Sequence, residues 1–390
     1  MATVEHAQTL APWRSHAVVL AFGAFAVGTD GFVVAGLLPS IATSLHVSVA
    51  SAGQLVTVFS IAYAVLAPVL AVLTASWSRR AVLVTALAVF AVGNAVTALA
   101  SGYGLVLGSR AIAAAGAALF TATASATAAR LAGERERGRA IAIVMLGVTS
   151  SLVLGAPLGT LIGGLLDWRA TMWLVTALAL LAAPSIALRL PAVHGNRDGG
   201  MRAFLAPLRD RRIIAVLVTT VVAFTGIYIP YTYVSEIFAP VASGSSLLAI
   251  LLLVYGLSGT AGNLTAGHLA DRYGPRRVIV AVTLILAAAF ALTPLGRDRL
   301  VAAIVTIVIV GFLSFSVTTP QQHLVITLAG PGAALVTSLY QSALYLAVSL
   351  SGAVGALGLN WWGAAQLPYV AAALMLGAAA LTFANGGPRR

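Results

Sequence analysis

The sequence predicts an all-α membrane protein with twelve transmembrane helices in two pseudo-symmetric six-helix bundles. Hydrophobic residues occupy 60% of the 390 positions and charged residues only 8%, and the mean hydropathy is +1.00. A soluble domain carries about 25% charged residues, so this chain has too few to cover a surface in water. No Asp, Glu, Lys or Arg occurs between Arg299 and Arg389, which is far more than the roughly 20 residues that one spanning helix needs. The chain must therefore cross the bilayer many times.

Apolar windows separated by clusters of Arg, Gly, Pro or Asn define the twelve predicted spans. In the first half these windows cover residues 16–39, 50–73, 80–100, 104–129, 138–165 and 169–190. In the second half they cover residues 213–238, 246–270, 276–295, 299–321, 332–359 and 365–385. The first window contains Asp30 and Pro39 and lacks a convincing cleavage site, so we interpret it as an uncleaved helix.

The arginines fall unevenly on the two sides of the membrane when the loops alternate between them. Most lie on one side, hereafter the arginine-rich end, including Arg14, Arg79, Arg80, Arg130, Arg139, Arg189, Arg211, Arg212, Arg272, Arg276 and Arg277. The opposite, arginine-poor end carries Arg169, Arg297 and Arg299. By the positive-inside rule the arginine-rich end and both termini are cytoplasmic. Taken singly, most of these arginines equally fit contact with anionic lipid or no specific partner.

This distribution also explains the net charge of +12 without a nucleic-acid partner. We expect a monomeric, multi-pass protein of the cell (inner) membrane whose partners are the lipid bilayer, protons and a small-molecule substrate.

The chain divides near its middle and repeats a loop motif. A polar segment at residues 191–212 separates the two predicted bundles, residues 1–190 and 213–390. The loop after span two reads AVLTASWSRRA from position 71, and the loop after span eight reads GHLADRYGPRR from position 267. The second copy resembles the cytoplasmic signature of the major facilitator superfamily, G-x-L-A-D-R-x-G-R-R. The first copy is degenerate, with Ala75 where the signature has Asp.

Two further segments carry the same resemblance. Span five is similar to the antiporter signature of that superfamily through Gly147, Gly155, Pro157, Gly159 and Gly163, although helix packing alone also explains a face of glycines. Span one, with TDGFVVAGLLPSIA, resembles the twelve-span drug:proton antiporter branch and its arabinose-efflux-permease-like exporters. The resemblance implies a central cavity that opens alternately to each side of the membrane.

Two charged residues lie well inside the predicted spans, Asp30 in span one and Arg110 in span four. An ion at membrane depth costs roughly 2.5–3.5 kcal/mol on insertion scales and is a functional candidate by default. Both residues lie at similar depth, so we expect them to share one cavity. In one interpretation Asp30 carries the proton and pairs with Arg110 or with a cationic substrate; in the other the pair is static and fixes helix packing.

The resemblance also implies a conformational latch at the arginine-rich end. Asp271 lies at the end of span eight, where a carboxylate can meet the positive N-terminus of span five near Arg139. Arg272, Arg276 and Arg277 surround it in sequence, although loop capping and topology explain these arginines equally well.

Polar and aromatic residues within the spans are candidates for substrate contact. The predicted set is Phe32, Tyr63, Phe224, Tyr228, Tyr231, Gln321 and Tyr345. Side chains of these types also serve as contacts between helices or as an interface belt, and we expect that role for more than half of the polar and aromatic residues in the spans.

The sequence favours transport over catalysis. It has no cysteine, its six histidines show no metal-ligand spacing, and it contains no nucleotide-binding motif. We therefore expect no enzyme activity, no metal and no cofactor. The predicted function is a proton-coupled secondary transporter that exports a small organic compound, drug-like or metabolite, by alternating access. The alternatives are an importer or proton symporter of the same fold and a non-transporting membrane sensor.

Overall fold

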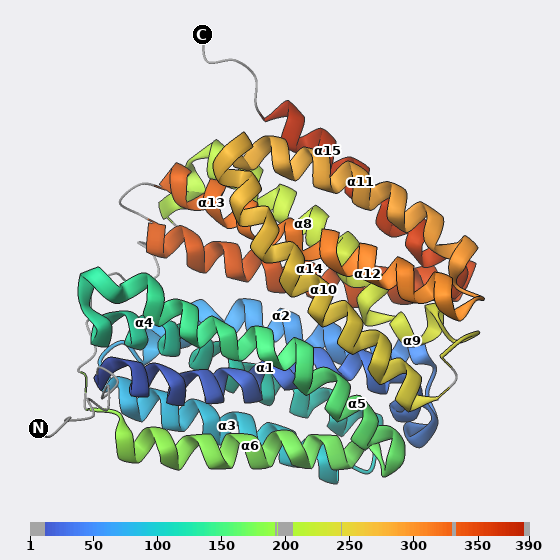
Figure 1. The fold of residues 1–390 in the computed structure, drawn as a ribbon. Coiled ribbons are helices and arrows are strands. Elements are labelled where there is room, and N and C mark those ends of the chain that lie inside the picture. The colour runs from blue at the N-terminus through green and yellow to red at the C-terminus, as the bar shows by residue number, and fades with distance from the viewer. Residues whose placement is uncertain (1–11, 192, 194–205, 243, 330–332, 386–390) are drawn as a thin grey trace, which may run out of the picture.

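The computed structural model describes residues 12–191, 193, 206–242, 244–329 and 333–385, and these fold into helices with short connections (Figure 1). The first half contains α1 Pro12–Leu45, α2 Val49–Leu73, α3 Arg79–Leu99, α4 Tyr103–Ser150, the π-helical turn η1 Ser151–Gly155, α5 Ala156–Leu165 and α6 Trp168–Arg189. The second half contains α8 Arg211–Thr232, α9 Val234–Ile237, α10 Ser245–Tyr273, α11 Pro275–Gly296, α12 Leu300–Ser316, α13 Thr318–Ala329, α14 Ala333–Trp362 and α15 Leu367–Ala384. The predicted all-α class is confirmed.

Twelve membrane crossings follow from these helices. Within the described residues, eleven helical stretches are long and apolar enough to span a bilayer, and one of them, Tyr103–Leu165, has 63 residues. That length far exceeds the ~20 residues of one crossing. The stretch turns back at Gly133, whose φ of 71° only glycine adopts readily, so it crosses twice.

Several predicted boundaries are wrong. Span one continues past Pro39 to Leu45, and His46 with a positive φ of 54° follows its end. Span ten does not end at residue 321, because α13 continues to Ala329. Span seven is interrupted after Thr232, and α9 follows as a single helical turn. Gly, Pro and Asn clusters locate turns in sequence, but the surrounding helices here stabilise one or two further turns of helix.

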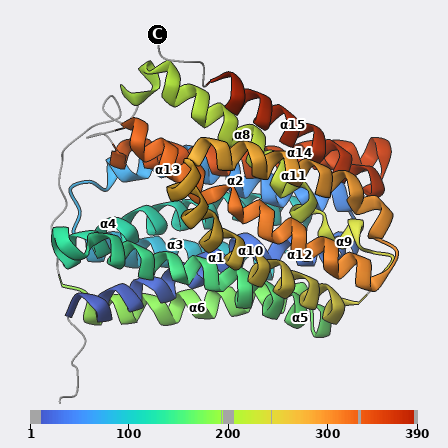
Figure 2. The same cartoon turned by 45° about the horizontal axis from the view of Figure 1, so that its top comes forward.

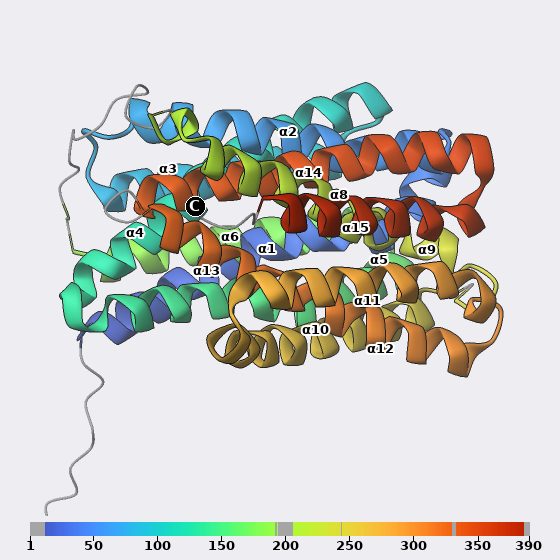
Figure 3. The same ribbon diagram turned by 90° about the horizontal axis from the view of Figure 1, so that it is seen from above.

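The two halves form two layers of helices that meet along α2 and α14. Figure 1 shows the first half below and the second half above, and Figure 3 shows α14 running beside α2. In the first half α4 packs against α1, α2 and α3. In the second half α8 packs against α14 and α15, as Figure 2 also shows. Most of the predicted linker, residues 192 and 194–205, lies outside the described residues.

The contacts between the halves run from the arginine-poor end to mid-depth. Between α2 and α14, the Thr57 hydroxyl donates to the carbonyl of Ser349 at 3.3 Å, and Tyr63 stacks on Tyr345 with ring centroids 3.5 Å apart. Between α5 and α10, Gly164 lies against Ser245. The Tyr231 hydroxyl donates to the carbonyl of Phe32 at 3.1 Å. The arginine-poor end is therefore closed in this conformation.

The glycines of span five bring its backbone into contact with α1. A Cβ atom at Gly147 would lie 2.1 Å from the carbonyl oxygen of Ala21, and one at Gly155 would lie 2.2 Å from the Thr29 hydroxyl. Gly159 and Gly163 face Val33 and Leu37 of the same helix in the same way. Pro157 follows η1, where the helix widens by one residue per turn. Small residues thus allow α1 and span five to pack closely along most of their length.

We expect Gly147→Ala to destabilise the protein, because the new methyl group meets a backbone carbonyl that cannot rotate away. Overpacking of this kind costs about 1–3 kcal/mol, and the expected result is a lower midpoint of thermal unfolding for the purified protein in detergent.

The matched control is Gly108→Ala in the same helix, because a Cβ atom there meets nothing within 4 Å. Both variants gain the same helix propensity, so equal unfolding midpoints would contradict the close packing.

Candidate functional site

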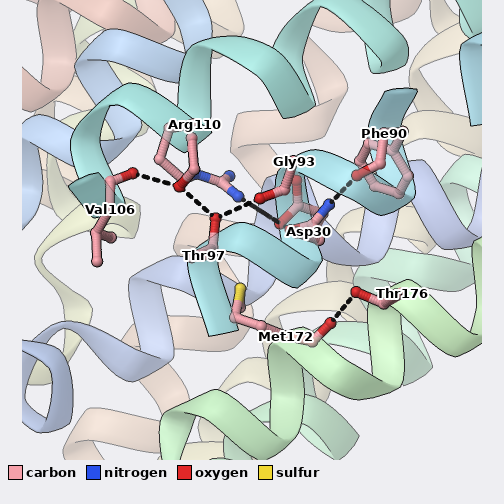
Figure 4. Close-up of polar contacts among 10 residues, drawn as sticks. Asp30, Phe90, Gly93, Thr97, Val106, Arg110, Met172 and Thr176 are labelled. Atoms are coloured by element: carbon pink, nitrogen blue, oxygen red, sulfur yellow. Dashed lines mark hydrogen bonds and ion pairs between the residues drawn. The ribbon is translucent and has the colours of Figure 1, made fainter. Parts of the chain in front are cut away.

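A buried ion pair lies in the middle of the first half. Nη1 of Arg110 on α4 donates to Oδ1 of Asp30 on α1 at 2.7 Å, and their side chains are 2% and 0% exposed (Figure 4). The structure thus brings together the two charged residues that the sequence singles out at membrane depth. In a hydrocarbon environment each charge stabilises the other, since either one alone would be costly to bury.

Two more helices complete the surroundings of Arg110. Its guanidinium lies over the ring of Phe59 on α2, 4.5 Å from the centroid, a distance suited to a cation–π interaction. Its Nη1 also donates to Oδ1 of Asn94 on α3 at 3.4 Å, while the Asn94 amide donates to the carbonyl of Phe90 at 3.1 Å. Side chains from α1, α2, α3 and α4 therefore converge on one buried charge.

The pairing leaves hydrogen-bonding capacity unused. Oδ2 of Asp30 and Nε of Arg110 are buried without a hydrogen-bond partner in the part of the chain that the structure describes. A bidentate arginine–carboxylate pair would use both carboxylate oxygens, whereas this pair uses one. Asp30 therefore retains an oxygen that can accept a further hydrogen bond while the other stays bonded to Arg110.

Six of the seven predicted substrate residues form two aromatic clusters, each joining both halves. Tyr63 stacks on Tyr345 across the α2–α14 contact with an interplanar angle of 14°. Phe32 meets Tyr231 edge to face, with ring centroids 6.1 Å apart. Tyr228 lies 6.1 Å from Tyr231 and 6.3 Å from Phe224 by ring centroids.

The structure does not bring Gln321 to these clusters. Gln321 is buried in the second half, where its amide oxygen accepts a hydrogen bond from the Thr220 hydroxyl at 2.7 Å. It lines a separate cavity at the arginine-rich end.

The predicted latch residues are apart in this conformation. Asp271 is exposed at the end of α10, and Arg139 pairs instead with Glu136 of its own helix at 3.2 Å. Arg276 bonds to the carbonyl of Thr382 on α15. Arg272 lies over the ring of Tyr273, and Arg277 is exposed.

The predicted set omits three residues that the structure places at or near these contacts. Phe59 holds the guanidinium of Arg110, and its signal was its position one helical turn before Tyr63 on the same face. Asn94 accepts from Arg110, as a polar residue within span three could have suggested. Glu236 lies half-buried in α9, which packs against α1, and burial raises the pKa of its carboxyl. Among the described residues, no group of three His, Cys, Asp or Glu side chains is placed to hold a metal ion.

Comparisons with known proteins agree with this architecture. The family model of the Major Facilitator Superfamily matches residues 20–352. YbcL, an uncharacterized MFS-type transporter of Bacillus subtilis (strain 168), is 30% identical over 361 residues, which is 92% of each chain. A chloramphenicol resistance protein of Streptomyces lividans is 33% identical over 360 residues, which is 91% of this chain and 87% of that one.

Solved structures share the fold at low sequence identity. The nucleoside transporter NupG superposes with a TM-score of 0.79 at 14% identity, covering 97% of this chain and 100% of that one. A bacterial homologue of the human lysosomal transporter Spinster gives 0.78 at 17% identity, covering 96% and 97%. The fold is that of a multi-pass membrane protein. The chain belongs to the Major Facilitator Superfamily.

The buried ion pair predicts that removing one charge destabilises the protein more than removing both. Asp30→Leu leaves the Arg110 guanidinium buried without its partner, and the expected cost is about 3–5 kcal/mol. The double variant Asp30→Leu/Arg110→Leu removes both charges and should recover most of that loss, as measured by thermal unfolding in detergent. If the double variant is no more stable than Asp30→Leu alone, the pair does not contribute through charge compensation.

Proposed function

We propose that this transporter exports a small organic compound across the inner membrane in exchange for protons, with its arginine-rich end in the cytoplasm. The observation that carries the proposal is the buried Asp30–Arg110 pair, in which one carboxylate oxygen has no hydrogen-bond partner among the described residues. The similarity to a chloramphenicol resistance protein supports the outward direction.

In the proposed mechanism Asp30 is the proton carrier. The pair is closed to water in this conformation, since both side chains are at most 2% exposed. Proton uptake would therefore take place in the conformation that opens at the arginine-poor end. There a proton would bind Oδ2 of Asp30, neutralise the carboxylate and weaken its bond to Arg110. Release to the cytoplasm would require a wider opening of the arginine-rich end, which lets water reach the pair.

The aromatic contacts offer a route from the pair to the boundary between the halves. The guanidinium of Arg110 lies on Phe59, the Phe59 ring lies 6.5 Å from Tyr63, and Tyr63 stacks on Tyr345 of the second half. A change in the position of Arg110 would thus reach the contact between α2 and α14 through adjoining side chains. We propose that this chain of contacts couples protonation of Asp30 to the change between the two conformations.

The same clusters indicate the class of substrate. Phe32, Tyr63, Tyr231 and Tyr345 supply aromatic rings from both halves, and Asp30 supplies the acidic group near them. Rings bind flat apolar groups and cations. We therefore propose neutral or cationic lipophilic compounds, which would displace the stacked rings of Tyr63 and Tyr345.

The latch is proposed to act in the other conformation. In this structure Asp271 is exposed and the arginine-poor end is closed, so the contact between Asp271 and the start of span five near Arg139 would form when the arginine-rich end closes. Its counterpart in the first half, Ala75, has no charge to oppose a helix dipole.

Asp30→Asn should abolish proton-driven transport, because asparagine forms hydrogen bonds but does not titrate. The measurement is uptake of chloramphenicol or ethidium into proteoliposomes under an imposed pH gradient, with proton flux recorded in parallel. Substrate flux opposite in direction to proton flux would indicate an exporter. Substrate flux in the same direction as proton flux would indicate a symporter.

The control for this variant is Asp298→Asn, which removes an acid that is 69% exposed at the arginine-poor end and should transport normally. If Asp30→Asn still accumulates substrate in response to the pH gradient, Asp30 is not the proton carrier.

Asp271→Ala should raise the population that is open at the arginine-rich end. A carboxylate at a helix N-terminus contributes roughly 0.3–2 kcal/mol, so its loss should shift the two-state equilibrium about 2- to 30-fold. Spin labels on Ser76→Cys and Thr327→Cys, both exposed positions in this cysteine-free chain, report the separation of the halves. An unchanged distance distribution would mean that Asp271 serves topology only.

A further inference from the structure

The cavity that Gln321 lines is at the arginine-rich end of the second half, away from the ion pair. It has a volume of about 400 Å³ and is bounded by the ends of α8, α11, α13 and α15. Three arginines line it: Arg211 and Arg212 in the first turn of α8, and Arg276 in the first turn of α11. Figure 2 shows α8 beside α15 at this side of the bundle.

Among the described residues that line this cavity, none carries a negative charge to balance the three arginines. A helix N-terminus carries a partial positive charge. The arginines in the first turns of α8 and α11 add their own positive charges to it. Arg276 is held by the Thr382 carbonyl at 3.0 Å and the Phe383 carbonyl at 3.3 Å, at the C-terminal end of α15. The nearby acid Asp210 accepts from the backbone N–H of Arg212 at 2.8 Å and is not among the lining residues.

A buried polar group also faces this cavity. Gln321 is 1% exposed and lines the cavity, and its amide oxygen accepts from Thr220. Its amide nitrogen has no hydrogen-bond partner among the described residues. Since Gln321 lines the cavity, its amide nitrogen can donate to a ligand that enters there.

The remaining wall is apolar. Val216, Ile279, Leu324 and Leu328 line the same cavity as the arginines. A free phosphate ion gains nothing from aliphatic walls, whereas a phospholipid presents both a phosphate and an acyl chain. The cavity also opens among helix ends, the depth at which headgroups lie, and basic pockets between transmembrane helices are known to hold anionic headgroups.

We propose that this cavity binds the phosphate headgroup of an anionic phospholipid, with Arg211, Arg212 and Arg276 on the phosphate and Gln321 donating a hydrogen bond to it. The lipid would tie the starts of α8 and α11 to the ends of α13 and α15.

The test compares binding of phosphatidylglycerol and phosphatidylcholine to the purified protein in detergent, by native mass spectrometry and by the shift in unfolding midpoint. The test variant is Arg211→Gln/Arg276→Gln. The matched control is Arg272→Gln/Arg277→Gln, which removes the same charge from neighbouring helix ends outside the cavity. We expect the test variant to bind phosphatidylglycerol about 30-fold more weakly, since each arginine near a membrane surface contributes about fivefold. The control should bind as the wild type does.

Three outcomes would overturn the proposal. Equal losses in both double variants would indicate attraction to a basic surface in general. Full stabilisation by inorganic phosphate alone would assign the cavity to a soluble anion. If the test variant fails to fold, the single variant Arg211→Gln, which breaks no bond to a carbonyl, should still weaken phosphatidylglycerol binding about fivefold; unchanged binding would exclude the site.

Discussion

The lack of water at membrane depth is the constraint on which the first half depends. The positive charge of Arg110 must be compensated wherever α4 places it. Asp30, Asn94 and the ring of Phe59 supply this compensation from three other helices. The packing of α1, α2 and α3 around α4 therefore also forms the binding site for one guanidinium. A substitution at any of these positions affects the helix arrangement and the chemistry together.

Close packing of α1 against span five depends on small residues, whereas the packing around Arg110 depends on charged and polar side chains. It rests on the absence of side chains, because Gly147, Gly155, Gly159 and Gly163 allow backbones to approach where any Cβ atom would clash. Lipid tails are as apolar as leucine, so helices in a membrane gain little from hydrophobic burial and depend on such contacts instead. The face is continuous with η1, where the helix is wider and its backbone less regular. The axes of span five and α1 therefore stay close together over most of the membrane, and this packing positions Asp30 on α1.

The sequence predicted the number of crossings and the all-α class, because hydropathy reports directly on the cost of placing polar groups in lipid. It also predicted that Asp30 and Arg110 lie at one depth, since helical rise converts position into depth. It could not predict the ends of α1 and α13, which neighbouring helices extend. It did not separate Gln321 from the aromatic residues either, because depth alone does not say which face of a bundle a side chain occupies. Spacing within α2 places Phe59 on the same face as Tyr63, but it does not reveal that this face meets Arg110 on α4.

The distribution of charge between the halves has a mechanical consequence. The interiors of the second-half spans contain no Asp, Glu, Lys or Arg, and the buried ion pair lies wholly within the first half. The proposed protonation of Asp30 would therefore change the electrostatics of the first half only. The second half can respond only through surfaces that touch the first, and the stacked rings of Tyr63 and Tyr345 lie closest to Arg110 along the chain of contacts through Phe59. A transporter built in this way would not need a titrating group in each half, because one charge and one aromatic contact suffice to bias two rigid bodies between two arrangements.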